Sequence, residues 1–283
     1  MLTIAEGGTP RFCGYAMTIF KAVIMGIVQG LTEFLPVSSS GHLVLAGHFL
    51  GVEGPGLFLE VMLHFGTLIA VVVVFWQDIA AMIRSVVLFI GRRRLNSHDQ
   101  MYLNLVWLLI LGSVPAAVLG LVFKSKLELL FGSTKTVGLM LGITGVILAI
   151  SGRLGSKGKQ LGQVTALDAL VIGTGQACAL VPGLSRSGTT IGASLFRGLD
   201  RPTAARFSFL LAIPAVLGAT VLELFSVSIT SEAIVPVIVG TISAAVFGFI
   251  AIKILMEVLN RGRLIYFSLY LWLLSALVLL GIK

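Results

Sequence analysis

Two short polar stretches stand out in an otherwise apolar chain, because their residue types could carry out phosphoryl chemistry. The first reads "QGLTEFLPVSSSGH" (29–42) and the second reads "PGLSRSGTT" (182–190). Ionisable groups placed in hydrocarbon cost free energy, so a cluster of them within a membrane protein indicates a functional site. A carboxylate, a histidine, several hydroxyls and an arginine could together bind and cleave a phosphate group.

The first stretch offers an acid, a base and a row of hydroxyls. Gln29 and Glu33 are four residues apart, so they share one face of a helix. A proline ends that helix, and the serines after it begin another, where free backbone N–H groups favour phosphate. His42 could act as general base or general acid. Ser39 or Ser38 could attack phosphorus, or could instead position a water molecule.

The second stretch repeats the hydroxyl-rich turn and adds a fixed cation. The guanidinium of Arg186 can hold phosphate through two parallel hydrogen bonds and stabilise charge on a transferred phosphoryl group. A divalent cation could bind Glu33 together with phosphate oxygens. The other candidates for substrate binding are the hydroxyls of the two turns: Ser38, Ser40, Ser185, Ser187, Thr189 and Thr190.

The composition places these residues in a membrane. The chain is 57% hydrophobic and 11% charged, with a mean hydropathy of +1.05, whereas a soluble domain carries about 25% charged residues. The net charge of +8 is spread between apolar segments, as in cytoplasmic loops, so we expect no nucleic-acid partner. Cys13 and Cys178 lie in different contexts and are expected to form neither a disulfide nor a metal site.

The apolar pattern predicts an all-α polytopic membrane protein with two kinds of element. Two segments, 18–50 and 165–197, break at the polar stretches, and the arm after each break measures about 14 Å of helix. Such an arm cannot cross a core about 30 Å thick, which predicts two re-entrant helical hairpins. Six transmembrane helices are predicted near 57–77, 103–123, 136–152, 203–225, 234–256 and 264–282.

The two halves of the chain resemble each other. At a shift of 147 residues Gly26, Gln29 and Ser38 align with identical residues, and "GSVPAAVLG" (112–120) resembles "GTISAAVFG" (240–248) at a shift of 128. This predicts one membrane domain, 17–283, made of two repeats at about 17–153 and about 164–283. Three spans follow each hairpin, so the repeats should have inverted topology, with both polar turns forming one site near the midplane.

The basic residues predict the orientation. One side collects eleven of them and the other six, so the richer side should be cytoplasmic, with both termini and the first hairpin outside. The eleven basic residues of the richer side are Arg92, Arg93, Arg94, Arg153, Lys157, Lys159, Arg197, Arg201, Arg206, Arg261 and Arg263.

The first sixteen residues lack the regions of a signal peptide and are expected to be a flexible extension, so either Met1 or Met17 could be the start.

The sequence resembles the undecaprenyl-diphosphate phosphatase family of bacterial inner membranes, the type linked to bacitracin resistance. The first stretch fits that family's (E/Q)xxxE segment with its serine-rich turn, and the second fits its PGxSRSGxT segment. The similarity runs over nearly the whole chain from about Thr18. Two motifs in order, with spans between them, make this match highly specific.

The resemblance implies hydrolysis of the polyprenyl substrate undecaprenyl diphosphate to the monophosphate carrier lipid used in cell-wall synthesis. It implies an inner-membrane enzyme that uses Mg²⁺ or Ca²⁺, has its active site open to the periplasm or outside, and forms a homodimer. Carried onto matching positions, the expected catalytic set is Glu33, Ser39, His42 and Arg186. Many members have glutamate where this chain has Gln29, whose amide oxygen can bind a metal ion but brings no charge.

Other functions fit less of the sequence. A transporter or flippase of the monophosphate carrier lipid would use inverted repeats and the same anion site, but it has less need of a histidine and a metal-binding glutamate. A type-2 phosphatidic-acid phosphatase would need histidine in place of Gly192. Glu60 and His64 form another i, i+4 pair, which we expect to be a structural pair packed near the site.

Overall fold

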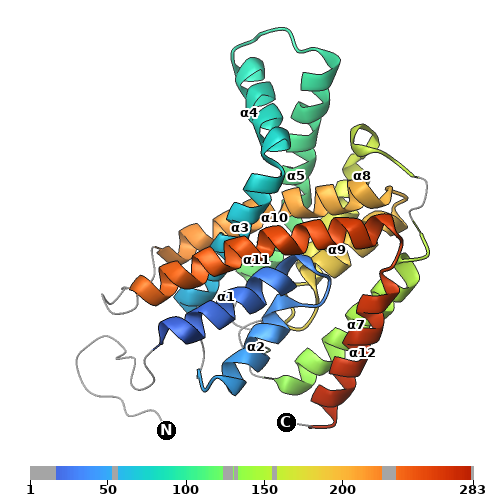
Figure 1. Cartoon of the computed structure of the whole chain (residues 1–283). Coiled ribbons are helices and arrows are strands. Elements are labelled where there is room, and N and C mark those ends of the chain that lie inside the picture. Colours follow the sequence, from blue (N-terminus) through green and yellow to red (C-terminus); the bar gives the residue numbers. More distant parts are fainter. Residues whose placement is uncertain are drawn as a thin grey trace.

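The protein is a bundle of α-helices (Figure 1). The computed structural model describes residues 17–52, 57–123, 130, 133–154, 158–224 and 234–281. The predicted extension, residues 1–16, lies outside the described residues. The long apolar helices agree with the expected all-α polytopic membrane protein, whereas the count of six spans and the division into repeats stay predictions.

Two pairs of helices break where the polar stretches lie. The first pair is α1 (Ile19–Phe34) and α2 (Ser39–Phe49), and the second is α8 (Ala166–Cys178) and α9 (Arg186–Phe196). The second arm of each pair is only 11 residues long. A serine is the N-cap residue of each of these arms. The Ser38 hydroxyl accepts the N–H of Gly41, and the Ser185 hydroxyl accepts that of Gly188.

Four helices are long and apolar enough to cross a membrane, within the part of the chain that the structure describes. They are α5 (Ser97–Val122), α7 (Thr134–Ser151), α10 (Arg201–Leu224) and α11 (Ile234–Asn260), at four of the predicted spans. The chain is therefore a multi-pass membrane protein. The last predicted span corresponds to α12 (Ile265–Leu279), which has 15 residues and is short for a crossing.

The first predicted span is not straight. It consists of α3 (Leu57–Val74) and continues into an unpredicted helix, α4 (Trp76–Ile90), after a bend of 81° (Figure 1). Neither proline nor glycine lies at this bend, so its basis is tertiary. The Phe75 ring packs 5.9 Å from that of Phe209, and Asp78 in the first turn of α4 is ion-paired with Arg206 of α10.

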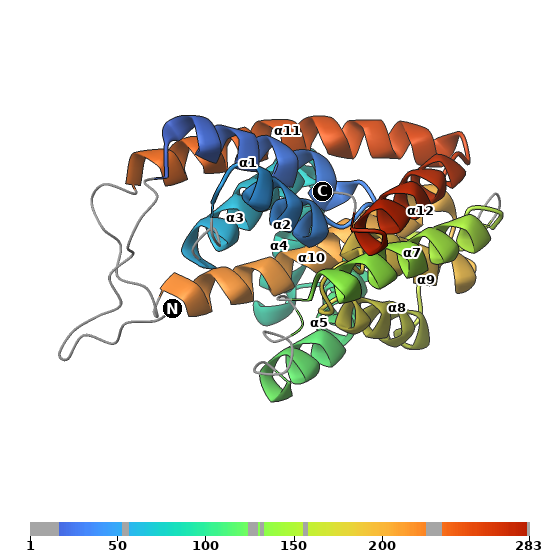
Figure 2. The ribbon, with the colours of Figure 1, turned by 90° about the horizontal axis from the view of Figure 1, so that it is seen from below.

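The hairpins and the long helices pack reciprocally. Helix α1 lies along α11, and α8 lies along α5, in both views (Figures 1 and 2). A Cβ on Gly26 would overlap the carbonyl oxygen of Gly240, and one on Gly173 would overlap that of Gly112. Gly26 corresponds to Gly173 at the shift of 147 residues, and Gly112 corresponds to Gly240 at the shift of 128 residues. The two contacts are therefore made by equivalent residues of the two halves. This is the pattern that two copies of one unit would give.

The second hairpin is held at its open end by a buried carboxylate. Asp168 lies in the first turn of α8, and its carboxylate accepts Lys159 Nζ at 2.9 Å and Arg197 Nε at 2.8 Å. Lys159 precedes the hairpin and Arg197 follows it, so this group, which we call the Asp168 clasp, ties the entry of the hairpin to its exit.

The glycine contact at Gly173 gives a first prediction. Replacing Gly173 by alanine should destabilise the protein by about 1–3 kcal/mol, because the new methyl group meets backbone that cannot rotate away. Gly218→Ala is the matched control, since nothing lies within 4 Å of a Cβ there. Thermal unfolding in detergent should show a lower midpoint for Gly173→Ala alone, and equal midpoints would contradict the close packing.

Candidate active site

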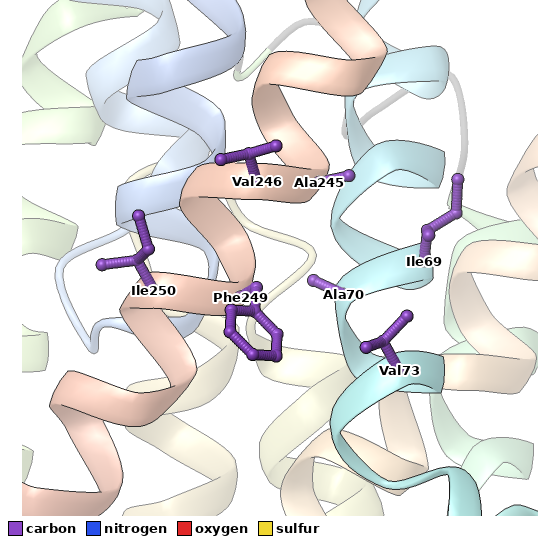
Figure 3. Close-up of a pocket in the computed structure, with 7 residues that line it drawn as sticks. All are labelled: Ile69, Ala70, Val73, Ala245, Val246, Phe249 and Ile250. Atoms are coloured by element: carbon purple, nitrogen blue, oxygen red, sulfur yellow. The ribbon is translucent and has the colours of Figure 1, made fainter.

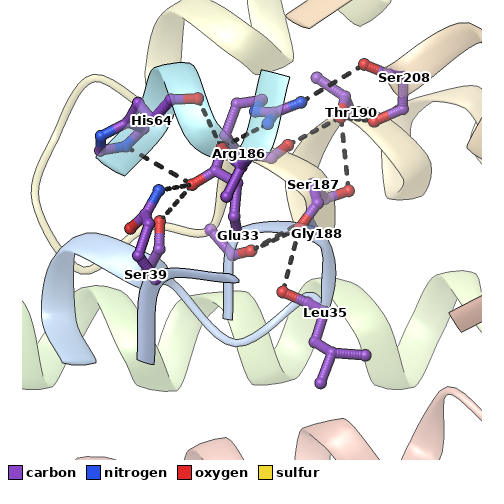
Figure 4. Close-up of polar contacts among 12 residues, drawn as sticks. Glu33, Leu35, Ser39, His64, Arg186, Ser187, Gly188, Thr190 and Ser208 are labelled. Carbon is purple, nitrogen blue, oxygen red and sulfur yellow. Dashed lines mark hydrogen bonds and ion pairs between the residues drawn. The ribbon is translucent and has the colours of Figure 1, made fainter. Parts of the chain in front are cut away.

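One apolar surface groove lies away from the polar residues. It is lined by apolar side chains of α3 and α11, including Ile69, Val73 and Phe249 (Figure 3). No polar side chain among the described residues lines it, so it has nothing to react with a phosphate group. The polar side chains gather instead where the breaks of the two hairpins meet (Figure 4).

The carboxylate of Glu33 is the centre of this polar cluster. Its Oε1 accepts Arg186 Nη2 at 2.5 Å, across 153 residues of sequence. Its Oε2 accepts Ser39 Oγ at 2.7 Å and Gln29 Nε2 at 3.0 Å, and His64 Nε2 lies 3.5 Å from the same oxygen. Three of the residues predicted from the two polar stretches are therefore in direct contact with Glu33.

Burial explains why Glu33 needs these partners. Its side chain is 6% exposed, and that of Arg186 is 18% exposed. A buried carboxylate without a counter-charge would cost several kcal/mol, and the guanidinium supplies that charge. The ion pair thus holds a reactive carboxylate and a phosphate-binding group side by side inside the protein.

The backbone adds favourable geometry for an anion. Ser39 is the first residue of α2 and Arg186 is the first residue of α9, so two helix N-termini approach the same cluster. The first turn of a helix presents N–H groups that have no partner within the helix, together with the positive end of its dipole. Ser38 precedes α2 with a φ of 71°, a left-handed conformation that costs a non-glycine residue roughly 1–3 kcal/mol.

The hydroxyls of the second turn join the loops and brace Arg186. Ser187 donates to the carbonyl oxygen of Leu35 at 3.2 Å and lies 3.2 Å from Ser185 Oγ. Thr190 Oγ1 lies 2.5 Å from Ser208 Oγ, while Arg186 Nη1 donates to the Ser208 carbonyl at 3.5 Å. Arg186 is thereby held from both α1 and α10.

Two other predicted hydroxyls make local bonds. Thr189 donates to the carbonyl oxygens of Ser185 and Arg186 within its own helix, at 2.9 and 3.0 Å. Ser40 Oγ lies 3.3 Å from Ser38 Oγ. Thr189 would have to exchange these bonds to reach a ligand, whereas either serine can be the donor in the contact between Ser38 and Ser40.

His42 is bonded to residues other than Glu33. Its Nδ1 donates to the carbonyl oxygen of Ser38 at 2.8 Å, so its Nε2 is left to accept the Tyr270 hydroxyl at 2.6 Å. The ring of Tyr270 is stacked on that of His42, with centroids 5.7 Å apart. His42 is therefore tied to α12 and makes no direct contact with the Glu33 carboxylate that the structure records.

Three residues of this region were not predicted as site residues. His64 comes from α3, Ser208 from α10 and Tyr270 from α12. The spacing of Glu60 and His64 shows that they share a helix face, but not what lies opposite. Here the imidazole of His64 lies against Glu33, so the pair is near the site as expected and one of its members is in contact with the central carboxylate.

The oxygen donors of α1 are suited to a divalent cation. Gln29 Oε1 is buried and has no hydrogen-bond partner among the described residues, although its amide nitrogen is bonded to Glu33. An amide oxygen and a carboxylate are the hard donors that Mg²⁺ and Ca²⁺ prefer, and phosphate oxygens usually complete such a site. Gln29 and Glu33 therefore fit a cation that is shared with a bound phosphate.

The arrangement as a whole can bind a phosphate and transfer it. A guanidinium and two helix N-termini provide positive potential, and a hydroxyl that donates to a buried carboxylate provides a nucleophile with an adjacent base.

Comparison with known proteins agrees with this chemistry. The model of the family described as "Bacitracin resistance protein BacA" matches residues 22–277. The "Undecaprenyl-diphosphatase" of Halothermothrix orenii is 41% identical over 267 residues, covering 93% of this chain and 98% of that protein. The proteins of the same name from Methanobrevibacter smithii and Moorella thermoacetica are 43% and 42% identical, covering 94% and 93% of this chain and 98% and 97% of their own lengths. This chain belongs to the bacitracin resistance protein BacA family.

Proposed function

We propose that this protein is an undecaprenyl-diphosphate phosphatase, which releases phosphate from the diphosphate lipid and regenerates the monophosphate carrier for cell-wall synthesis. Such recycling would confer bacitracin resistance. The observation that carries the proposal is the contact of Arg186 and Ser39 with the buried carboxylate of Glu33, in a multi-pass membrane protein. The names of the relatives support the same activity.

Ser39 is the nucleophile in this proposal. Its hydroxyl donates to Glu33 Oε2 at 2.7 Å, so the carboxylate can take the proton as the serine oxygen attacks the terminal phosphorus. The bond from phosphorus to the bridging oxygen then breaks, and the monophosphate lipid leaves with that oxygen. After Glu33 has passed that proton to solvent, water attacks the phosphoserine and gives a proton to Glu33, inorganic phosphate is released, and Glu33 returns the proton to the Ser39 oxygen.

Arg186 binds the terminal phosphate during both steps. Its guanidinium is held by Glu33 and Ser208, and it can exchange the Glu33 contact for phosphate oxygens that carry more charge. Ser185, Ser187, Thr189 and Thr190 lie in the first turn of the same helix or cap it, and they surround that phosphate with hydroxyl and N–H donors.

A divalent cation held by Glu33 and Gln29 would neutralise charge on the diphosphate and orient its oxygens. The buried Gln29 Oε1 without a partner supports this site. Ser38 and Ser40, at the start of α2, are proposed to bind the phosphate next to the lipid chain.

We propose His42 as the proton donor to the leaving monophosphate. The Nε2 atom now accepts the hydroxyl of Tyr270, so the imidazole must first take up a proton and exchange this bond for one to the substrate. His42→Asn should lower the turnover number for phosphate release, and unchanged turnover would remove His42 from the mechanism.

The decisive experiment measures phosphate release from undecaprenyl diphosphate by the purified protein, with and without EDTA. Release that stops on chelation and returns with added Mg²⁺ or Ca²⁺ is expected. A protein that binds the lipid but releases no phosphate with any metal tested would overturn the phosphatase proposal, and it would favour a carrier of the monophosphate lipid.

Ser39 can be tested directly by trapping the phosphoenzyme. Acid quenching during turnover should give a chain with one added phosphoryl group on Ser39, detected by mass spectrometry, because the serine ester forms before water arrives. Ser39→Ala should show neither the adduct nor turnover, while Ser40→Ala keeps the adduct. An active Ser39→Ala variant would assign the attack to water.

We also propose that the site opens to the outside of the inner membrane, with both termini on that side. The basic connection of residues 91–96 and the C-terminal end of α12 lie at opposite ends of the molecule in Figure 1, which supports this orientation. A cysteine placed at Arg94 should be protected from an impermeant maleimide in intact cells, whereas one at Gly281 should be labelled. The homodimer implied by the family resemblance is tested by the mass of the protein in detergent.

A further inference from the structure

The imidazole of His64 has a defined hydrogen position. Its Nδ1 lies 2.8 Å from the carbonyl oxygen of Glu60, and a carbonyl oxygen only accepts, so Nδ1 carries a hydrogen. In the neutral ring the Nε2 atom then has a free lone pair, and this atom lies 3.5 Å from Glu33 Oε2 (Figure 4). In the neutral ring two acceptor atoms thus face each other, between a Glu33 side chain that is 6% exposed and a His64 side chain that is 33% exposed.

Such a contact is stabilised by positive charge between the two acceptors, which either a proton on Nε2 or a metal ion can supply. A metal ion meets this need, because a neutral imidazole and an ionised carboxylate are both metal ligands. The other side of the His64 ring supports this reading, since metal-binding histidines almost always donate their second N–H to a carboxylate or a backbone carbonyl. The bond from His64 to Glu60 is of that kind.

A third donor lies on the same side of Glu33. Gln29 Oε1 is buried without a partner among the described residues, and the Gln29 amide contacts the same oxygen, Glu33 Oε2, that faces His64. Rotating the Gln29 amide group by about 180° would exchange Nε2 for Oε1 and direct a second oxygen at the space between Glu33 Oε2 and His64 Nε2. Helix α1 would then provide two oxygens and α3 one nitrogen.

We propose that His64 Nε2 is a ligand of the divalent cation, together with Glu33 and Gln29. This rests on the proposed function, because the cation is the one that would bind the diphosphate. The nitrogen donor favours a first-row transition-metal ion over Mg²⁺ or Ca²⁺, which prefer oxygen donors. Position 29 is glutamine in this chain, and the His64 nitrogen would supply part of the cation binding that a carboxylate at that position would give.

Arg186 adds a condition to cation binding. Its guanidinium holds the other oxygen of Glu33 at 2.5 Å, so a cation and an arginine share one carboxylate. Like charges at this distance repel, and the negative charge of phosphate offsets the repulsion. Cation binding should therefore be weak alone and stronger with pyrophosphate, and Arg186→Ala should strengthen binding of the metal alone.

The test uses Mn²⁺ with the purified full chain in detergent, with and without pyrophosphate. Pulsed electron paramagnetic resonance should detect coupling of bound Mn²⁺ to an imidazole nitrogen in the wild type, and this coupling should be absent in His64→Gln. His64→Gln should also weaken Mn²⁺ binding at least about tenfold and reduce the preference for Mn²⁺ over Mg²⁺. His48→Gln, a change at an exposed histidine of α2, is the control that keeps both properties.

The outcomes separate this proposal from the proposed function. If bound Mn²⁺ shows nitrogen coupling but no phosphate is released, His64 remains a ligand and the proposed phosphatase activity is wrong. Phosphate release in a wild-type protein whose bound Mn²⁺ shows no nitrogen coupling would overturn the His64 ligand alone. The wild-type spectrum decides this even if the His64→Gln variant does not fold.

Discussion

Replacing Arg186 by alanine is expected to lower phosphate release from undecaprenyl diphosphate by about 10³–10⁵-fold, the range over which an arginine accelerates phosphoryl transfer in other enzymes. Arg186 is the first residue of α9, and its guanidinium contacts both Glu33 and the Ser208 carbonyl. It is therefore already in place before the substrate binds. The charge that develops on the transferred phosphoryl group would meet a fixed cation.

Two further variants separate lost chemistry from lost stability. Arg186→Lys keeps the charge but loses the planar fork, so it should recover only part of the rate. Arg197→Ala removes one of the two ion pairs of the Asp168 clasp, at the other end of the same helix, and it should lower the melting midpoint without a comparable loss of rate. An Arg186→Ala variant that is folded and within tenfold of the wild-type rate would contradict the proposed role.

Local sequence signals were sufficient to predict the two breaks between helices and several of the polar residues that lie together there. The four-residue spacing of Gln29 and Glu33 placed them on one helix face, and their side chains are in fact bonded at 3.0 Å. The internal similarity indicated that two distant turns should meet, and the contact of Arg186 with Glu33 joins them. Both features follow from helix periodicity and turn residues, which a single sequence displays.

The remaining features depend on contacts between distant segments. The 81° bend after α3 has no proline or glycine to mark it, and the residues that accompany it, such as Phe209 and Arg206, come from α10. Similarly, His42 is bonded to Tyr270, which lies 228 residues away. A helix pattern shows which residues share a face, but it does not show which side chain of another helix that face will meet.

Replacing Glu33 by glutamine is expected to lower phosphate release by about 10²–10⁴-fold, the usual contribution of a positioned acid or base. The amide cannot take the proton of Ser39, whose hydroxyl donates to Glu33 Oε2 at 2.7 Å. It also brings no charge to the cation. Rates measured with the variant and the wild type at saturating lipid test this directly, and a variant with full activity would exclude Glu33 as the base.

The single change has a second effect, because it leaves Arg186 buried without its counter-charge. Breaking a buried ion pair costs about 3–5 kcal/mol, so a loss of activity could follow from unfolding. The double variant Glu33→Gln with Arg186→Gln removes both charges and should recover most of that stability. If the ion pair were only structural, the double variant would recover activity together with its melting midpoint. We expect the midpoint to recover and the activity to stay absent, because a neutral pair can neither accept the proton of Ser39 nor hold a phosphate.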